Sequence, residues 1–213
     1  MRQSYLFLIL FCLFASEPAH AIKTAASFDL SYAIAQLNLS ASQVSAAGST
    51  STTPVGTTQL TSYSGLELDY NVAMFDYRTV ASFSFMQFQN SNLGNAPISR
   101  VGFGISYYLL RINGQRVVLD NQVEGKVWGV APALELTFGV NKLSVKDPSN
   151  ANLDFTAGLL DAVPRLLIEI PLSSTFLLML RAGTYMTLKG STTQYNIKLT
   201  GGIFNIGFKL TTL

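Results

Sequence analysis

The sequence predicts an all-β fold, namely a closed antiparallel up-and-down transmembrane β-barrel. First, 48% of the 213 residues are hydrophobic and only 12% are charged, against roughly 25% charged residues in an average soluble domain. Second, apolar and small or polar residues alternate with a period of two in many segments, which is typical of strands with two unlike faces. Third, no apolar run after residue 21 reaches the roughly 20 residues of a membrane-spanning helix.

Eight segments carry this alternation, and each is long enough for the roughly 9–11 residues with which a tilted strand crosses a bilayer. The connection at 113–126 is long, and Asn113-Gly114 within it is a strong tight-hairpin signal. A ten-stranded barrel that turns there and returns along 115–119 is therefore the alternative. The eight predicted strands are 26–39, 58–72, 77–90, 98–112, 127–143, 158–172, 175–189 and 195–212.

Residues 1–21 are predicted to be a cleavable signal peptide, and 22–213 the barrel. Arg2 gives a positive start, 5–15 are apolar, and Ala19-His20-Ala21 fits the small-x-small cleavage rule. The chain's one cysteine, Cys12, and its one histidine would be removed with this segment. Cysteine and histidine chemistry would then be lost, so we expect no enzymatic activity, no cofactor and no metal.

The polar face of the predicted strands carries small residues, as a narrow lumen requires. These are Gly102, Gly104, Ser106, Gly139, Gly183 and Gly207. The opposite face is rich in phenylalanine, and tyrosine and tryptophan lie mostly toward segment ends, as at a membrane interface. We therefore expect the apolar face to meet lipid and the polar face to line the lumen. A soluble exported barrel or sandwich that binds a small ligand is the alternative.

Strand parity predicts a balanced set of charged residues in the lumen. Paired charges are less costly to bury than isolated ones, so the set predicts an ion-pair network that closes the lumen, with Glu67 and Asp69 paired to Arg78 across a short turn. Its members are Asp29, Glu67, Asp69, Glu135, Glu169, Arg78, Arg100, Arg165, Arg181 and Lys209.

Two further expectations concern solutes and the outer loops. Apolar residues predicted in the lumen indicate a second hypothesis, a narrow channel or carrier for small or apolar solutes; they are Val80, Met86, Leu110 and Leu167. The oxygen-rich segment 147–154 is interpreted as an outer loop tip.

From about residue 26 onward, the pattern resembles the small eight-stranded outer-membrane barrels of Gram-negative bacteria, typified by the OmpA transmembrane domain, OmpX and OmpW. The row Phe204, Ile206, Phe208 and Leu210 resembles the signal read by the barrel-assembly machinery, although the chain ends in Leu213 rather than an aromatic residue. The resemblance implies an outer-membrane location, with outer-membrane lipid and that machinery as partners. The balanced, small-residue lumen indicates a non-enzymatic barrel with a structural or surface-interaction role carried by its loops, whose partner is not specified.

Net charge and topology complete the expectations. The formal net charge is +2 and lysine and arginine form no run, so no nucleic-acid partner is expected. With the N-terminus in the periplasm, the periplasmic turns would be 73–76, 113–126 and 173–174. The outer loops would then be 40–56, 89–97, 144–157 and 189–194.

Overall fold

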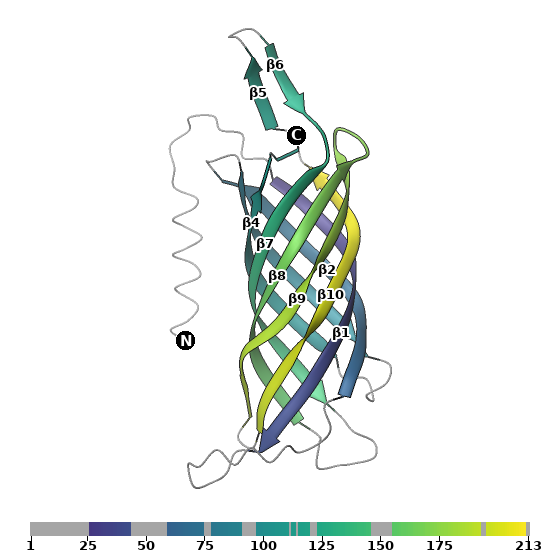
Figure 1. The fold of residues 1–213 in the computed structure, drawn as a ribbon, viewed down its shortest axis with the longest axis vertical. Helices are drawn as coiled ribbons and strands as arrows, with labels where there is room; N and C mark the ends of the chain where they lie inside the picture. Colours follow the sequence, from purple (N-terminus) through teal and green to yellow (C-terminus); the bar gives the residue numbers. More distant parts are fainter. Residues whose placement is uncertain are drawn as a thin grey trace.

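Eight strands form one closed barrel in the computed structural model of the protein (Figure 1). The structure describes residues 26–43, 59–74, 78–90, 97–110, 112–113, 115–119, 123–145, 155–192 and 195–211. The predicted all-β barrel with eight strands is thereby confirmed. The barrel strands are β1 (Ala26–Gln43), β2 (Gln59–Ala73), β3 (Thr79–Gln89), β4 (Ile98–Tyr108), β7 (Ala131–Val145), β8 (Phe155–Pro171), β9 (Phe176–Ser191) and β10 (Tyr195–Thr211).

The barrel closes between its first and last strands, in the ring order β1-β10-β9-β8-β7-β4-β3-β2, and every neighbouring pair is antiparallel. The closing ladder runs unbroken from Ser27–Thr211 to Gln43–Tyr195. Apart from the closing pair, and with β5 (Gln115–Leu119) and β6 (Val123–Val127) left aside, neighbours in the ring also follow one another along the chain, so the topology is up-and-down. In the described part of the chain, no helix is long and apolar enough to span a membrane.

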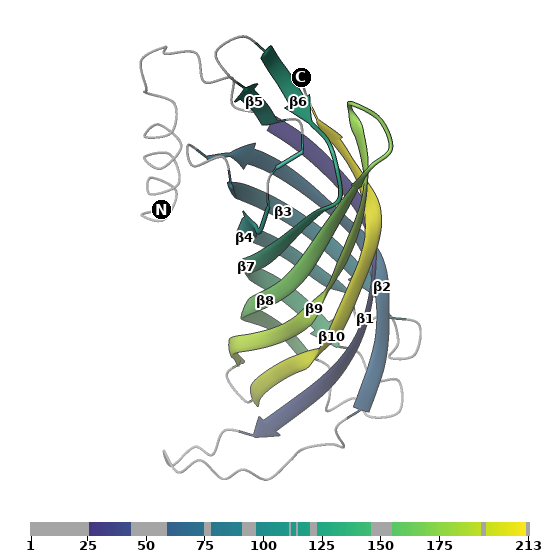
Figure 2. The ribbon, with the colours of Figure 1, turned by 45° about the horizontal axis from the view of Figure 1, so that its top comes forward.

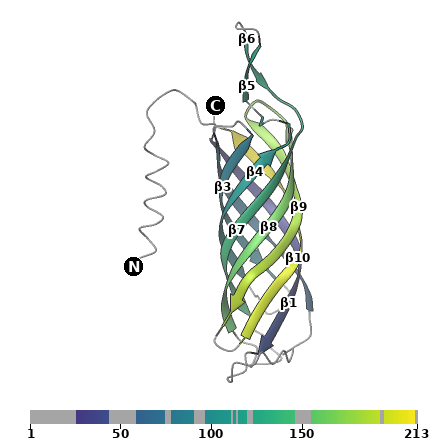
Figure 3. The same cartoon turned by 60° about the vertical axis from the view of Figure 1, so that its left-hand side comes forward.

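A separate hairpin projects beyond one end of the barrel, between β4 and β7 (Figures 1 and 3). It consists of β5 (Gln115–Leu119) and β6 (Val123–Val127), which pair only with each other. The ten-stranded alternative is therefore wrong: 115–119 is a strand, but it does not enter the barrel. We call this end, where the C-terminus also lies (Figure 2), the hairpin end, and the opposite end the far end.

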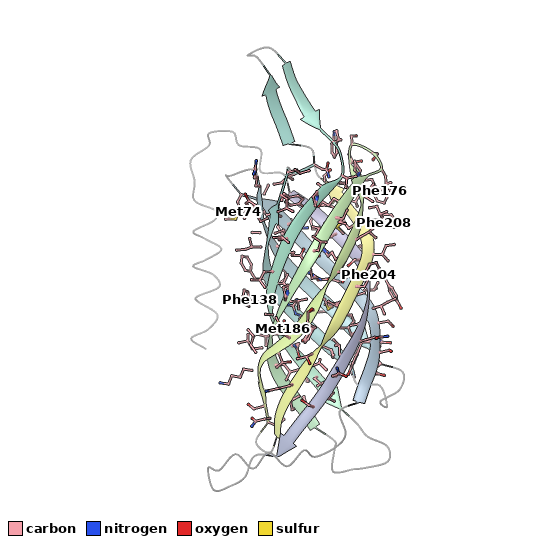
Figure 4. All side chains as sticks on the ribbon, in the orientation of Figure 1. Met74, Phe138, Phe176, Met186, Phe204 and Phe208 are labelled. Carbon is pink, nitrogen blue, oxygen red and sulfur yellow. The ribbon has the colours of Figure 1, made fainter. Side chains whose placement is uncertain are left out.

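Burial alternates along the strands, and the apolar residues face outward. In β4 the alternation is strict from Ile98 to Tyr108. Phe138, Phe204 and Phe208 lie on the outer surface, each about half exposed (Figure 4). Phe208 stacks on Phe176 of β9, with ring centroids 4.9 Å apart. The small residues predicted to line a narrow lumen lie inside, because they share the parity of the buried side chains.

The two faces exchange their character near the far end. There the interior is apolar, in a cluster contributed by all eight barrel strands that we call the far-end core: Ala33, Ala35, Leu37, Tyr63, Met86, Phe88, Ile98, Leu143, Ala157, Leu159, Val163, Tyr185, Ile197, Leu199 and Ile203. The exterior at this level is polar and exposed, and we call it the collar: Gln36, Ser62, Gln87, Ser99, Lys142, Thr156, Lys189, Lys198 and Thr200.

The far end is thus arranged like a soluble barrel, and the remainder like a membrane barrel. The six longer strands have 15 to 18 residues, more than the roughly 9–11 that cross a bilayer. At a strand tilt of about 45°, six additional residues extend the barrel by on the order of 15 Å. The collar and the far-end core occupy this additional length.

Candidate functional site

The lumen holds ten buried charged side chains, which come from seven of the eight barrel strands. Four are basic and six are acidic, so the predicted balance of five and five is corrected. Nine were expected from parity, and Asp161 is the tenth. They are Asp29, Glu67, Asp69, Arg100, Glu135, Asp161, Arg165, Glu169, Arg181 and Lys209.

Arg165 of β8 connects three walls of the lumen. Its Nη1 donates hydrogen bonds to both carboxylate oxygens of Glu67, at 2.9 and 2.7 Å. Its Nε donates to Glu135, which stands directly opposite it in the β7–β8 ladder. Asn205 of β10 also donates to Glu67, at 2.5 Å. Because β2 and β8 are diametrically opposed in the ring, the pair of Arg165 and Glu67 spans the lumen.

Arg181 of β9 joins two further carboxylates to the same network. Its Nη2 donates to Asp29 Oδ2 at 2.7 Å, and its Nη1 lies 2.8 Å from Asp69 Oδ2. Its Nε lies 3.3 Å from Glu135 Oε2, so Glu135 is shared by both arginines. Asp29 and Asp69 face each other in the β1–β2 ladder, and the guanidinium between them offsets the repulsion of two adjacent like charges.

Arg100 of β4 organises a second cluster, nearer the far end. Its Nε donates to Asp161 Oδ1 at 2.8 Å and its Nη2 to Thr137 Oγ1 at 3.0 Å. Two glycines make room for the guanidinium. A Cβ at Gly139 would lie 2.5 Å from Arg100 Nε, and one at Gly102 would lie 2.7 Å from Nη1. These contacts account for the glycines at positions 102 and 139.

The second carboxylate oxygen of Asp161 is satisfied by uncharged groups. Tyr185 donates to Asp161 Oδ2 at 2.8 Å, and Asn141 Nδ2 donates to the same atom at 2.6 Å. Tyr185 belongs at the same time to the far-end core. The charged middle of the lumen therefore continues without a break into the apolar far end.

A third cluster closes the hairpin end. Lys209 Nζ donates to Glu169 Oε1 at 2.5 Å and to the Tyr108 hydroxyl at 3.1 Å, and that hydroxyl also donates to Glu169. Asn113, which lies between β4 and the hairpin, is buried against this cluster. Its side-chain amide donates to Glu169 Oε2 at 3.4 Å, and its Oδ1 accepts from the Gly129 N–H at 2.9 Å. Asn113, predicted as a turn residue, lies in a turn and also caps the lumen.

Two other expectations are corrected. Arg78 is exposed at the hairpin end, outside the lumen, and Glu67 and Asp69 pair with Arg165 and Arg181 rather than with it. Leu110 is 63% exposed. Val80, Met86 and Leu167 are buried inside as predicted, but each is packed in an apolar cluster.

Sequence reasoning missed Asp161, although a signal for it was present. Arg165 and Glu169 share a parity in β8, and two strand steps back from Arg165 on that parity reach Asp161. The expected loop tip at 147–154 and the expected signal peptide lie outside the described residues. Among the residues that the structure describes, no group of three or more His, Cys, Asp or Glu side chains is placed to hold a metal ion.

No protein-family model and no curated protein sequence matches the chain. Solved structures with a similar fold include two outer-membrane proteins. Neisserial surface protein A aligns with a TM-score of 0.53 and 13% identity, covering 87% of this chain and 97% of that one. The outer membrane protein OprG from Pseudomonas aeruginosa aligns with a TM-score of 0.54 and 14% identity, covering 89% and 96%. The architecture-level resemblance to small outer-membrane barrels is thereby confirmed.

Proposed function

We propose that this protein is a non-enzymatic barrel of a Gram-negative outer membrane, with a closed lumen and a structural or surface-interaction role. One observation carries the proposal, which is that the lumen is filled along its length. Ion pairs bridge opposite walls in the middle, the cluster of Lys209 and Glu169 closes the hairpin end, and the far-end core closes the other. A conducting pore requires a continuous polar path, and the far-end core interrupts it.

The exterior supports a membrane location. About half of the surface of each large outward-facing side chain is exposed, and these side chains form a belt on all eight barrel strands. Monomeric soluble proteins rarely expose a contiguous apolar patch beyond a few hundred Å². In a lipid bilayer the same belt would contact the apolar acyl chains. A closed barrel also leaves no unpaired strand edge in the bilayer.

The orientation places the hairpin end in the periplasm and the far end outside the cell. The collar favours this orientation, because a barrel extended beyond the membrane with a soluble-type core raises its loops above the lipid surface. The connections at 44–58, 90–97 and 146–154 all leave from the far end. Export by a signal peptide at 1–21 and insertion by the barrel-assembly machinery belong to the same proposal.

Single-channel recording tests the closed lumen. Residues 22–213 are refolded in detergent, shown to be folded by heat-modifiable gel mobility, and added to a planar bilayer alongside a general porin as the insertion control. We expect no steady current. Reproducible ion-selective steps would overturn the proposal and favour a narrow channel for small solutes. Recovery of the native protein from periplasm or medium without detergent would overturn the membrane location and favour a soluble ligand-binding barrel.

A further inference from the structure

The described charged side chains on the outside of the barrel have a single sign. Of the charged side chains that the structure describes, ten lie inside and four are exposed, and all four exposed ones are basic. Arg78 stands at the hairpin end. Lys142, Lys189 and Lys198 stand in the collar, at the far end.

These three lysines lie close together in register, on three of the four adjacent strands β7 to β10. Lys142 of β7 faces Gly158 of β8, and Lys189 of β9 faces the next outward residue of β8, Leu160. Lys198 of β10 falls between two positions that pair with β9, at Asn196–Ser191 and Thr200–Met186. We call the three the lysine row.

The lysine row borders the apolar belt. One outward step below Lys142 is Val140, which is 63% exposed, and beside Lys189 are Leu160 and Leu188, which are 43% and 56% exposed. Gly158 separates Lys142 from Lys189, and a Cβ there would meet nothing within 4 Å. The surface thus places two lysines beside an apolar wall, with open space at the Gly158 position that separates them.

The opposite side of the collar differs. On β1 to β4 the outward positions at this level are Gln36, Ser62, Gln87 and Ser99, all exposed and all uncharged. Positive charge is therefore confined to one side, over β7–β10. A generally solvated collar would distribute its charges over all strands and use both signs.

We propose that the lysine row binds the phosphate headgroup of an anionic lipid in the outer leaflet. The inference rests on the proposed outer-membrane location and orientation. A lipid fits because it is amphipathic: its phosphates meet the ammonium groups while its acyl chains lie along Val140, Leu160 and Leu188. A soluble polyanion would use the charges and leave the adjoining apolar wall without a partner.

The test measures binding of lipid A carrying two phosphates to the full-length folded protein in detergent, by native mass spectrometry. The variant combines Lys142→Gln, Lys189→Gln and Lys198→Gln. Each lysine near an anionic surface contributes about fivefold in affinity, so we expect a loss of about 100-fold. Arg78→Gln, which removes the same charge at the other end, is the matched control and should bind as the wild type does. Gel mobility verifies that every variant is folded.

Four results would overturn the inference. The triple variant could bind lipid A as tightly as the wild type, or Arg78→Gln could lose about fivefold in affinity, the contribution expected of one lysine, which would indicate net charge alone. Tighter binding of lipid-free heparin than of lipid A would assign the row to a soluble polyanion. A wild type that folds in neutral phosphatidylcholine but ignores lipid A refutes only this inference, whereas one that never folds in lipid refutes the proposed function.

Discussion

At the scale of single residues, the lumen depends on arginines that each serve several carboxylates. Arg165 meets Glu67 and Glu135, and Arg181 meets Asp29, Asp69 and Glu135. A guanidinium offers five donors in a fixed fork, and a lysine in its place could not reach two walls in the same way. The sharing also means that the loss of one arginine leaves more than one buried charge without compensation.

Arg165→Leu should therefore lower the free energy of unfolding by about 3–5 kcal/mol, because Glu67 and Glu135 lose their common partner in a buried setting. Urea titration of the lipid-folded barrel, followed by tryptophan fluorescence, measures the change. Adding Glu67→Gln and Glu135→Gln to this variant should recover part of the loss. An equal or greater loss in the triple variant would contradict the ion-pair account and indicate packing instead.

Gly139 provides a second residue-scale prediction. A Cβ at this position would lie 2.5 Å from Arg100 Nε, so Gly139→Ala should displace the guanidinium and destabilise the barrel by about 1–3 kcal/mol. Gly158→Ala is the matched control, because a Cβ there meets nothing within 4 Å, and it should change stability by less than about 0.5 kcal/mol. Equal effects from both in urea titration would show that strand glycine itself, and not the space for Arg100, decides the outcome.

At the scale of elements, alternation predicted the strands well because one face had to differ from the other along most of each strand. The predicted strand at 195–212 compares with Tyr195–Thr211, and that at 98–112 with Ile98–Tyr108. Parity likewise gave nine of the ten buried charges. It failed for Arg78, which precedes β3, because a residue outside a ladder has no fixed face.

Other features of the elements were beyond local pattern. The far-end core was not predicted, since parity distinguishes two faces without saying which one meets water at each level of the barrel. The position of the hairpin was also missed. Asn113-Gly114 carries a strong turn signal and Asn113 does lie in a turn, but the strand at 115–119 pairs with 123–127 instead of entering the barrel.

The β5–β6 hairpin should be dispensable for folding. It contributes no ladder pair to the barrel, and the first pair of its own ladder, Gln115–Val127, already brings the two chain ends together. Replacing 115–127 by Asn-Gly, with Asn113 and Gly129 retained, should leave heat-modifiable gel mobility unchanged. Asn113→Ala in the full-length chain is the contrasting variant, and loss of its bond to Glu169 should cost about 1 kcal/mol. An unfolded deletion variant would show that the hairpin helps to form the barrel.

At the scale of the whole molecule, two patterns of amphipathicity succeed each other along one barrel axis. In the middle of the barrel, the lumen is charged and the exterior apolar, and near the hairpin end the lumen combines the cluster of Lys209 and Glu169 with a small apolar cluster that includes Val80 and Leu167. At the far end, the interior is apolar and the exterior polar. Under the proposed outer-membrane location, the same eight strands would provide both a membrane anchor and a water-stable extension, and the change from one to the other would place the lipid boundary next to the lysine row.

Orientation can be tested with two engineered thiols, because the one native cysteine, Cys12, lies in the predicted signal peptide. Ser191→Cys is exposed at the far end and Ser174→Cys at the hairpin end. In intact cells, a membrane-impermeant maleimide should label Ser191→Cys at once and Ser174→Cys only after the outer membrane is permeabilised. The unsubstituted protein is the control, and it should stay unlabelled if the signal peptide has been removed.

Each pattern of labelling has a separate structural meaning. The opposite order would invert the barrel, placing the collar and the lysine row in the periplasm and removing the basis for an outer-leaflet lipid site. Labelling of both positions in intact cells would mean that both ends of the barrel are accessible from outside, as in a released soluble form. The expected order places the far-end core above the outer leaflet. The seal of the lumen would then lie outside the lipid, where the collar already gives the barrel a polar surface toward water.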